Sequence, residues 1–151
     1  MIYFDTSYLA RLYIDDHGFT EVRSLAANQR VAAAVLGRVE TMAALHRAYR
    51  ERRSSEQVFR QQVRQFQDDC AQDAFTWLPL TSRVFERAEE IYLHAPANVF
   101  LRAADALHLA SAREYGFGEI YSNDRHLLAA APLFGIKGVN LILPSRVPLT
   151  K

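Results

Sequence analysis

Four carboxylate side chains stand at the ends of predicted secondary-structure elements, where they could act together. Asp5 directly follows the apolar run of residues 1–4, and Asp124 follows a second short apolar run. Glu40 and Asp105 lie near the starts of two segments with helical spacing. Oxygen ligands without cysteine suit a hard cation such as Mg²⁺ or Mn²⁺ rather than zinc. Such ions polarise phosphates and activate water, so these residues predict phosphodiester hydrolysis.

Each of these acids also has a purely structural explanation. Asp5 and Asp124 are suitable helix N-caps. Glu40 and Asp105 would complement the helix dipole from a first turn. A structural explanation does not suffice for four acids that converge, because they repel one another. Two unit charges about 4 Å apart repel by on the order of 4 kcal/mol at an effective dielectric constant of about 20. A divalent cation would relieve that repulsion, so we predict a shared metal site that needs no protein nucleophile.

Short apolar runs, several of them rich in Val, Ile or aromatic residues, predict the strands of the fold. They span residues 1–4, 31–36, 75–78, 120–121 and 139–143. Between them, apolar residues recur every three or four positions, which is typical of helices. The helical segments span residues 39–49, 59–74, 84–95 and 102–115. This alternation predicts an α/β fold with a mostly parallel central sheet of about five strands and helices on both faces.

Local signals mark some of the boundaries. Ser54 followed by Gln57 fits the capping box that begins a helix. Gly116 after Tyr115 fits the left-handed residue that ends one. Gly37 is expected to break the second strand before the next helix begins.

The predicted topology brings the four acids to one edge of the sheet. Ligands of open parallel sheets bind outside the carboxyl ends of the strands. Asp5 and Asp124 directly follow strands, and Glu40 lies in the first turn of the helix after the strand 31–36. The helix that contains Asp105 must run antiparallel to the strands if it feeds the next one, so its first turn lies at the same edge.

Length and composition indicate a single domain. The chain has 151 residues, of which 50% are hydrophobic and 23% charged, and it contains no repeat or Pro/Gly-rich linker. A chain of this size can bury one substantial core, so we predict one domain over residues 1–151. The formal net charge is only +1. Any surface that binds nucleic acid must therefore be local.

The sequence predicts neither a membrane segment nor a secretion signal. The longest stretches without Asp, Glu, Lys or Arg, residues 91–101 and 126–136, are far shorter than the about 20 apolar residues that a membrane-spanning helix needs. No charged leader with an apolar core precedes Asp5. Cys70 is the only cysteine, which excludes an intramolecular disulfide and a cysteine-cluster zinc site. We expect a soluble protein of the reducing cytoplasm.

Several basic side chains have two interpretations each. Arg102 lies one turn before Asp105, so its guanidinium could bind a phosphate or neutralise the acids. The densest basic stretch either contacts RNA or forms a solvated helical face. Its members are Arg47, Arg50, Arg52, Arg53, Arg60 and Arg64. His108 follows Asp105 by three residues, but its apolar neighbours Leu107 and Leu109 favour a core histidine over a metal ligand.

The motifs around the four acids resemble those of PIN domains, and within that family they are most similar to VapC-type toxins. The segments that carry the resemblance are Asp5-Thr6-Ser7, Arg38-Val39-Glu40-Thr41, the run from Leu101 to Ala110, and Ser122-Asn123-Asp124. Together they extend over nearly the whole chain. The run around Asp105 and the Ser-Asn-Asp motif 19 residues later are the most specific.

The resemblance implies a compact α/β/α domain that acts as a Mg²⁺- or Mn²⁺-dependent endoribonuclease. It further implies a homodimer and a cognate VapB-like antitoxin that occupies the active-site groove. Asp5 and Asp105 would be the principal metal ligands, with Glu40 and Asp124 completing the set. The supporting or substrate-contacting candidates are Thr6, Ser7, Arg102, Ser122 and Asn123. Many relatives have Ser or Thr shortly before the glutamate, where this chain has only the apolar residues 34–37.

Three functions follow from these patterns. The first is a toxin endoribonuclease that cuts structured RNA with metal-activated water. The second is a housekeeping PIN nuclease of RNA processing, which gene context would distinguish from a toxin. The third is a catalytically silent PIN module that binds a partner protein, which the presence of all four acids disfavours.

Overall fold

Five short parallel strands form the centre of the fold. The computed structural model describes residues 1–144. Its strands are β1 (Ile2–Tyr3), β2 (Val31–Ala34), β3 (Phe75–Leu78), β4 (Glu119–Tyr121) and β5 (Lys137–Val139). β1, β2 and β3 form one parallel sheet, β4 and β5 form another, and a parallel bridge between Phe4 and Tyr121 joins the two. The spatial order is therefore β3-β2-β1-β4-β5, which confirms the predicted parallel sheet.

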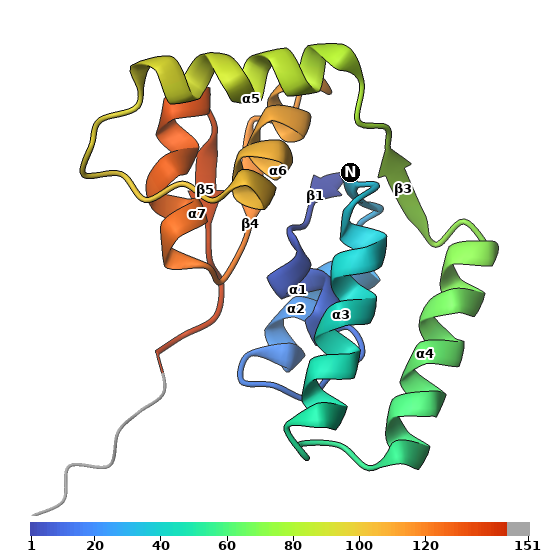
Figure 1. The fold of residues 1–151 in the computed structure, drawn as a ribbon. Coiled ribbons are helices and arrows are strands. Elements are labelled where there is room, and N and C mark those ends of the chain that lie inside the picture. The colour runs from blue at the N-terminus through green and yellow to red at the C-terminus, as the bar shows by residue number, and fades with distance from the viewer. Residues whose placement is uncertain (145–151) are drawn as a thin grey trace, which may run out of the picture.

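Helices cover the strands from both sides (Figure 1). They are α1 (Thr6–Arg11), α2 (Phe19–Ala27), α3 (Gly37–Arg50), α4 (Glu56–Ala71), α5 (Ser82–His94), α6 (Ala103–Glu114) and α7 (Arg125–Ala130), and a short 3₁₀ helix spans Ala131–Phe134. Gly116 ends α6 with a φ of 80°, as its position predicts. Within residues 1–144, no helix is both long and apolar enough to cross a membrane.

Two hydrophobic cores lie on opposite faces of the strands. Successive side chains of a strand point to opposite faces, so Tyr3 and Phe4 enter different cores. Tyr3 packs with residues of α5, α6 and α7, whereas Phe4 packs with residues of α1, α3 and α4. Both cores share the same strands, and the single domain over residues 1–151 stays a prediction. The end of that predicted domain, residues 145–151, lies outside the described part of the chain.

Several local boundaries differ from the predictions. The second strand ends at Ala34 rather than at Leu36, and Gly37 begins α3. α4 is capped by Ser55 rather than Ser54, because the Ser55 hydroxyl accepts the bond from the Val58 backbone N–H at 3.2 Å. The last strand covers residues 137–139 rather than 139–143. It ends early because Asn140 and the following backbone bind the Tyr8 hydroxyl of α1, which draws the chain away from the sheet.

Candidate active site

Asp5 and Asp124 each begin a short helix directly after a strand. The Asp5 Oδ1 accepts a hydrogen bond from the Tyr8 backbone N–H at 3.1 Å and so caps α1. The Asp124 Oδ1 caps α7 and accepts from the backbone N–H groups of His126 at 2.8 Å and Leu127 at 3.2 Å. The capping interpretation of both acids is therefore confirmed. It does not exclude a second role, because each cap also lies at the carboxyl end of a strand.

Glu40 and Asp105 lie in the first turns of α3 and α6, as their spacing predicts. Asp105 is buried, with 8% of its surface exposed. Glu40 faces α1, whose Thr6 hydroxyl donates a hydrogen bond to Glu40 Oε1 at 2.9 Å. The two helices come this close because Gly37 begins α3, where a Cβ atom would lie 3.1 Å from Leu9 Cδ1. Thr6 thus supplies the polar partner that residues 34–37 cannot.

All four acids line a single cavity of about 220 Å³. Its lining residues are Asp5, Thr6, Ser7, Glu40, Arg102, Ala104, Asp105, His108 and Asp124. The acids reach it from four elements that are far apart in the sequence. A larger cavity of about 700 Å³ between α3 and α4 is lined mainly by apolar side chains and has no carboxylate or histidine. The chemistry therefore favours the smaller cavity as the functional site.

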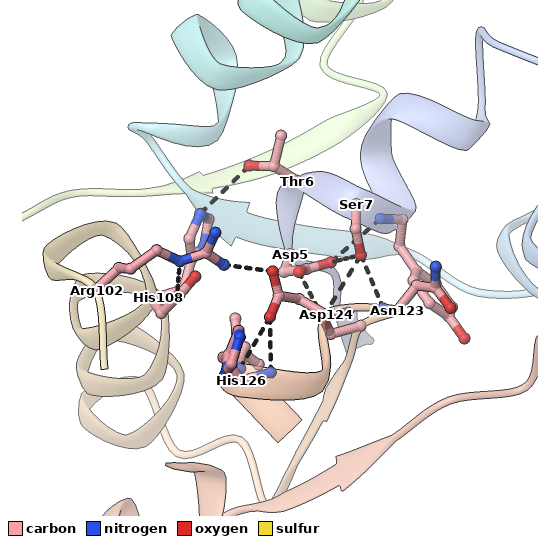
Figure 2. Close-up of polar contacts among 12 residues, drawn as sticks. Asp5, Thr6, Ser7, Arg102, His108, Asn123, Asp124 and His126 are labelled. Carbon is pink, nitrogen blue, oxygen red and sulfur yellow. Dashed lines mark hydrogen bonds and ion pairs between the residues drawn. The ribbon is translucent and has the colours of Figure 1, made fainter. Parts of the chain in front are cut away.

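Arg102 bridges two of the acids. Its Nε donates to Asp105 Oδ2 at 2.7 Å, and its Nη2 donates to Asp124 Oδ2. Figure 2 shows the guanidinium pointing toward Asp124, with a dashed line between them. Burial acts to raise the pKa of Asp124, but the bond from Arg102 and the two cap N–H groups lower it. Arg102 therefore neutralises the acids, while 48% of its side chain remains exposed at the rim of the cavity.

Hydroxyl groups tie the loop after β1 to the loop after β4 (Figure 2). The Ser122 hydroxyl donates to Asp5 Oδ2 at 2.6 Å, and the Ser7 hydroxyl donates to Asp5 Oδ1 at 2.7 Å. In return, Ser122 Oγ accepts from the Asp124 N–H at 2.9 Å, and Ser7 Oγ accepts from the Asn123 N–H at 2.8 Å. Burial raises the pKa of Asp5, and the serine bonds oppose that shift. These hydroxyls hold a buried carboxylate in a fixed orientation.

The sequence interpretation favoured a core role for His108 and did not predict its contact with Glu40. His108 is a core histidine, as expected, with only 2% of its surface exposed. Its Nε2 nevertheless lies 2.6 Å from Glu40 Oε1. Burial acts to raise the pKa of Glu40, whereas His108 and Thr6 lower it. The three-residue spacing from Asp105 places both side chains on one helix face, which was the signal for this role.

The donor set of the cavity suits a hard divalent cation. Among residues 1–144, however, no three His, Cys, Asp or Glu side chains stand together closely enough to hold a metal ion. Arg102 lies between two of the acids, because it binds one oxygen of Asp105 and one of Asp124. Its guanidinium supplies the positive charge that the cluster requires.

The basic stretch between α3 and α4 is partly committed to local ion pairs. Arg47 pairs with Glu51 at 2.8 Å, and Arg53 pairs with Asp16 at 2.8 Å. Arg60 pairs with Glu56 on the same helix. In the described chain, Arg50, Arg52 and Arg64 form no such pair, which leaves these three as candidates for contact with RNA.

Comparison with known proteins places this arrangement in a family. The family model of the PIN domain matches residues 2–132. The chain belongs to the PIN domain family. No curated protein sequence matches it. The four acids of the cavity all fall inside the matched range.

This PIN domain resembles several solved structures, including the following two. The Mycobacterium tuberculosis toxin VapC20, which cleaves the sarcin-ricin loop, has a TM-score of 0.65 and 22% sequence identity, covering 86% of this chain and 95% of the toxin chain. VapBC2 from Rickettsia felis, bound to a DNA fragment from its promoter, has a TM-score of 0.64 and 14% identity, covering 93% and 98%. At these identities the likeness concerns the fold.

Proposed function

We propose that this PIN domain is a metal-dependent endoribonuclease and the toxin of a VapBC-type toxin–antitoxin system. The observation that carries the proposal is the convergence of four carboxylates on one cavity of a PIN domain. VapC20, which shares the fold, cleaves the sarcin-ricin loop. We therefore expect a structured RNA as substrate, recognised by its shape and by unpaired bases.

Asp5 and Asp105 are the proposed principal ligands of Mg²⁺ or Mn²⁺, and Glu40 and Asp124 complete the site. When bound, the cation supplies polarisation of the scissile phosphate and a lower pKa for an attacking water. The chain itself holds the carboxylates in place. Hydroxyl groups fix both oxygens of Asp5, so that this buried side chain has a single orientation when substrate arrives.

Arg102 is the proposed contact to the RNA backbone. Guanidinium groups form paired hydrogen bonds with phosphate oxygens, and this one lies half-exposed at the rim of the cavity. At present its partners are oxygens of Asp105 and Asp124 that the proposed site needs as ligands. We expect Arg102 to exchange these partners for a substrate phosphate.

The proposed partners are those of a toxin. VapBC2, whose fold is similar, was solved with a promoter DNA fragment, so we expect a VapB-like antitoxin for this chain and joint binding of promoter DNA. A homodimer and a cytoplasmic location belong to the same proposal. Size-exclusion chromatography with light scattering, with and without the product of the neighbouring gene, tests both associations.

The function is tested by cleavage of purified ribosomal and transfer RNA in the presence of Mn²⁺ or Mg²⁺. The wild-type protein should cut at defined positions, and EDTA should stop the reaction. Asp105→Asn should abolish cutting without a change in fold, whereas the exposed control Glu89→Gln should leave it unchanged. Cleavage that persists in Asp105→Asn, or no cleavage of any RNA by the folded wild type, contradicts the proposal.

The two other functions give different results. A housekeeping nuclease would cut RNA in the same assay, but its induction would not arrest growth, and no small DNA-binding protein would be encoded beside it. A silent PIN module would bind no Mn²⁺ in calorimetry, either alone or with RNA. Mapping the new RNA ends after brief induction identifies the target of a toxin.

A further inference from the structure

A continuous chain of hydrogen bonds runs from the central strands to the carboxylate of Glu40. The backbone N–H of Ala34 in β2 donates to the Tyr3 hydroxyl at 3.0 Å. The Tyr3 hydroxyl lies 2.9 Å from His108 Nδ1, and His108 Nε2 lies 2.6 Å from Glu40 Oε1. The chain thus connects β2, β1, α6 and α3. It enters the site from the core behind the cavity rather than from solvent.

One proton of this chain can be assigned from its geometry. Glu40 Oε1 is a carboxylate oxygen and accepts hydrogen bonds, so the hydrogen in this contact belongs to His108 Nε2. On the other side of the ring, the Tyr3 hydroxyl bonds Nδ1, and burial raises the pKa of Tyr3, so the phenol keeps its proton. Tyr3 therefore holds the His108 ring in place from the core.

The same contacts leave the two oxygens of Glu40 unequal. Thr6 and His108 both donate to Oε1. In the described chain Oε2 has no hydrogen-bond partner from the protein, and Glu40 lines the cavity. Tyr3 is fully buried and His108 nearly so, and buried polar networks are stiff because each member would be costly to leave unpaired.

We infer that Tyr3 and His108 are positioning residues, which turn Glu40 so that Oε1 is held by the protein and Oε2 is presented to the cavity. This inference rests on the proposed function, because the presented oxygen serves the same metal site. Outer residues that orient a ligand typically change metal affinity or activity by about 10- to 100-fold when they are mutated. We expect that range for the loss of this chain.

The test compares variants that differ in one hydrogen bond. His108→Leu removes the donor to Glu40, whereas His108→Gln places an amide N–H close to the position of Nε2. Tyr3→Phe removes the hydroxyl and keeps the ring. We expect His108→Leu to weaken Mn²⁺ binding, measured by calorimetry, by about 10-fold or more, Tyr3→Phe to weaken it less, and His108→Gln to restore most of it. His94→Leu, an exposed histidine on α5, should have no effect.

A second measurement does not depend on metal or activity. In the metal-free wild type, ¹⁵N NMR of the imidazoles should show a hydrogen on Nε2 of His108. An Nε2 without a hydrogen overturns the inference whatever the folding of the variants. Full Mn²⁺ affinity and cleavage in folded His108→Leu and Tyr3→Phe also overturn it.

The outcomes separate this inference from the proposed function. If the wild type cuts RNA, and cleavage is lost in Asp105→Asn but unchanged in the Tyr3 and His108 variants, only the positioning role is ruled out. If Mn²⁺ binding depends on His108 but no RNA is cleaved, only the proposed ribonuclease activity is ruled out. A folded wild type that binds no Mn²⁺ overturns both.

Discussion

At the scale of single residues, Asp5 shows how one side chain can serve both stability and chemistry. It caps α1, accepts hydrogen bonds from two serines and lines the cavity. Its two oxygens are both engaged by the protein, in contrast to Glu40, which uses only Oε1. The structural and the functional interpretations of an acid at the end of a strand are therefore not alternatives.

Asp5→Asn should abolish RNA cleavage and leave the metal-free protein at least as stable as the wild type. Burial raises the pKa of Asp5, which means that its charged form is disfavoured in the folded protein. An asparagine keeps an Oδ1 for Tyr8 and Ser7 and offers an N–H to Ser122. The check is thermal melting in EDTA, together with the cleavage assay. A melting temperature several degrees below that of the wild type would show that the charge supports the fold.

Arg102→Ala should strengthen Mn²⁺ binding and weaken RNA binding. The guanidinium holds two oxygens of the proposed site, and a partly exposed ion pair is worth about 1 kcal/mol or less. We therefore expect Mn²⁺ affinity to rise by up to about 5-fold. Arg87→Ala is a matched control, because Arg87 pairs with Glu114 outside the cavity. If calorimetry without RNA shows that Arg102→Ala binds Mn²⁺ more weakly than the wild type, then Arg102 stabilises the metal site and does not compete with the cation.

At the scale of elements, the long helices were predictable and the short ones were not. α4, α5 and α6 extend over three or more turns, so their apolar spacing repeats often enough to be recognised. α1 and α7 have six residues each and begin at Asp5 and Asp124. Their capping acids are visible in the sequence, but a helix of this length shows too little periodicity. The positions of the four acids could be predicted from the ends of strands and the starts of helices. The contact between His108 and Glu40 could not, because it joins residues that are 68 positions apart.

Ser122→Ala should destabilise the protein, because one hydroxyl connects the caps of two helices. It donates to Asp5 at the start of α1 and accepts the backbone N–H of Asp124 at the start of α7. The residue is fully buried, so its loss leaves Asp5 Oδ2 and the Asp124 N–H without a partner, at a cost of about 1–3 kcal/mol. Urea unfolding measures the change. Ser24→Ala, at an exposed position of α2, should alter stability by a few tenths of a kcal/mol at most.

At the scale of the whole molecule, composition and alternation predicted the architecture well. Helices alternating with apolar strands gave the parallel order, because parallel strands need crossover connections. Composition and alternation could not predict where the chain leaves the sheet. The interaction of Asn140 with Tyr8 joins residues that are 132 positions apart, and no local pattern encodes it. The near-neutral net charge also does not show which arginines are available to bind RNA, because that depends on the ion pairs in the fold.

RNA binding should weaken as salt concentration rises, but less than the number of arginines suggests. Several members of the basic stretch already pair with acids. Each phosphate contact contributes about 0.7 to 0.9 to the slope of log affinity against log salt. Arg50→Gln and Arg64→Gln should each lower this slope, and Arg60→Gln should not. Fluorescence anisotropy with Asp105→Asn and a labelled RNA measures it. A slope near zero would exclude the basic stretch from binding.

The bridge between Phe4 and Tyr121 has a mechanical consequence. Among residues 1–144, it is the one ladder rung between the two sheets, supplemented by one bond from the Asp5 N–H to the Tyr121 carbonyl. The acids follow on both sides of this junction, with Asp5 on one sheet and Asp124 on the other. A ligand that binds both Asp5 and Asp124 therefore holds the two halves of the molecule together. Its binding should slow amide hydrogen exchange in the strands at the junction of the two sheets.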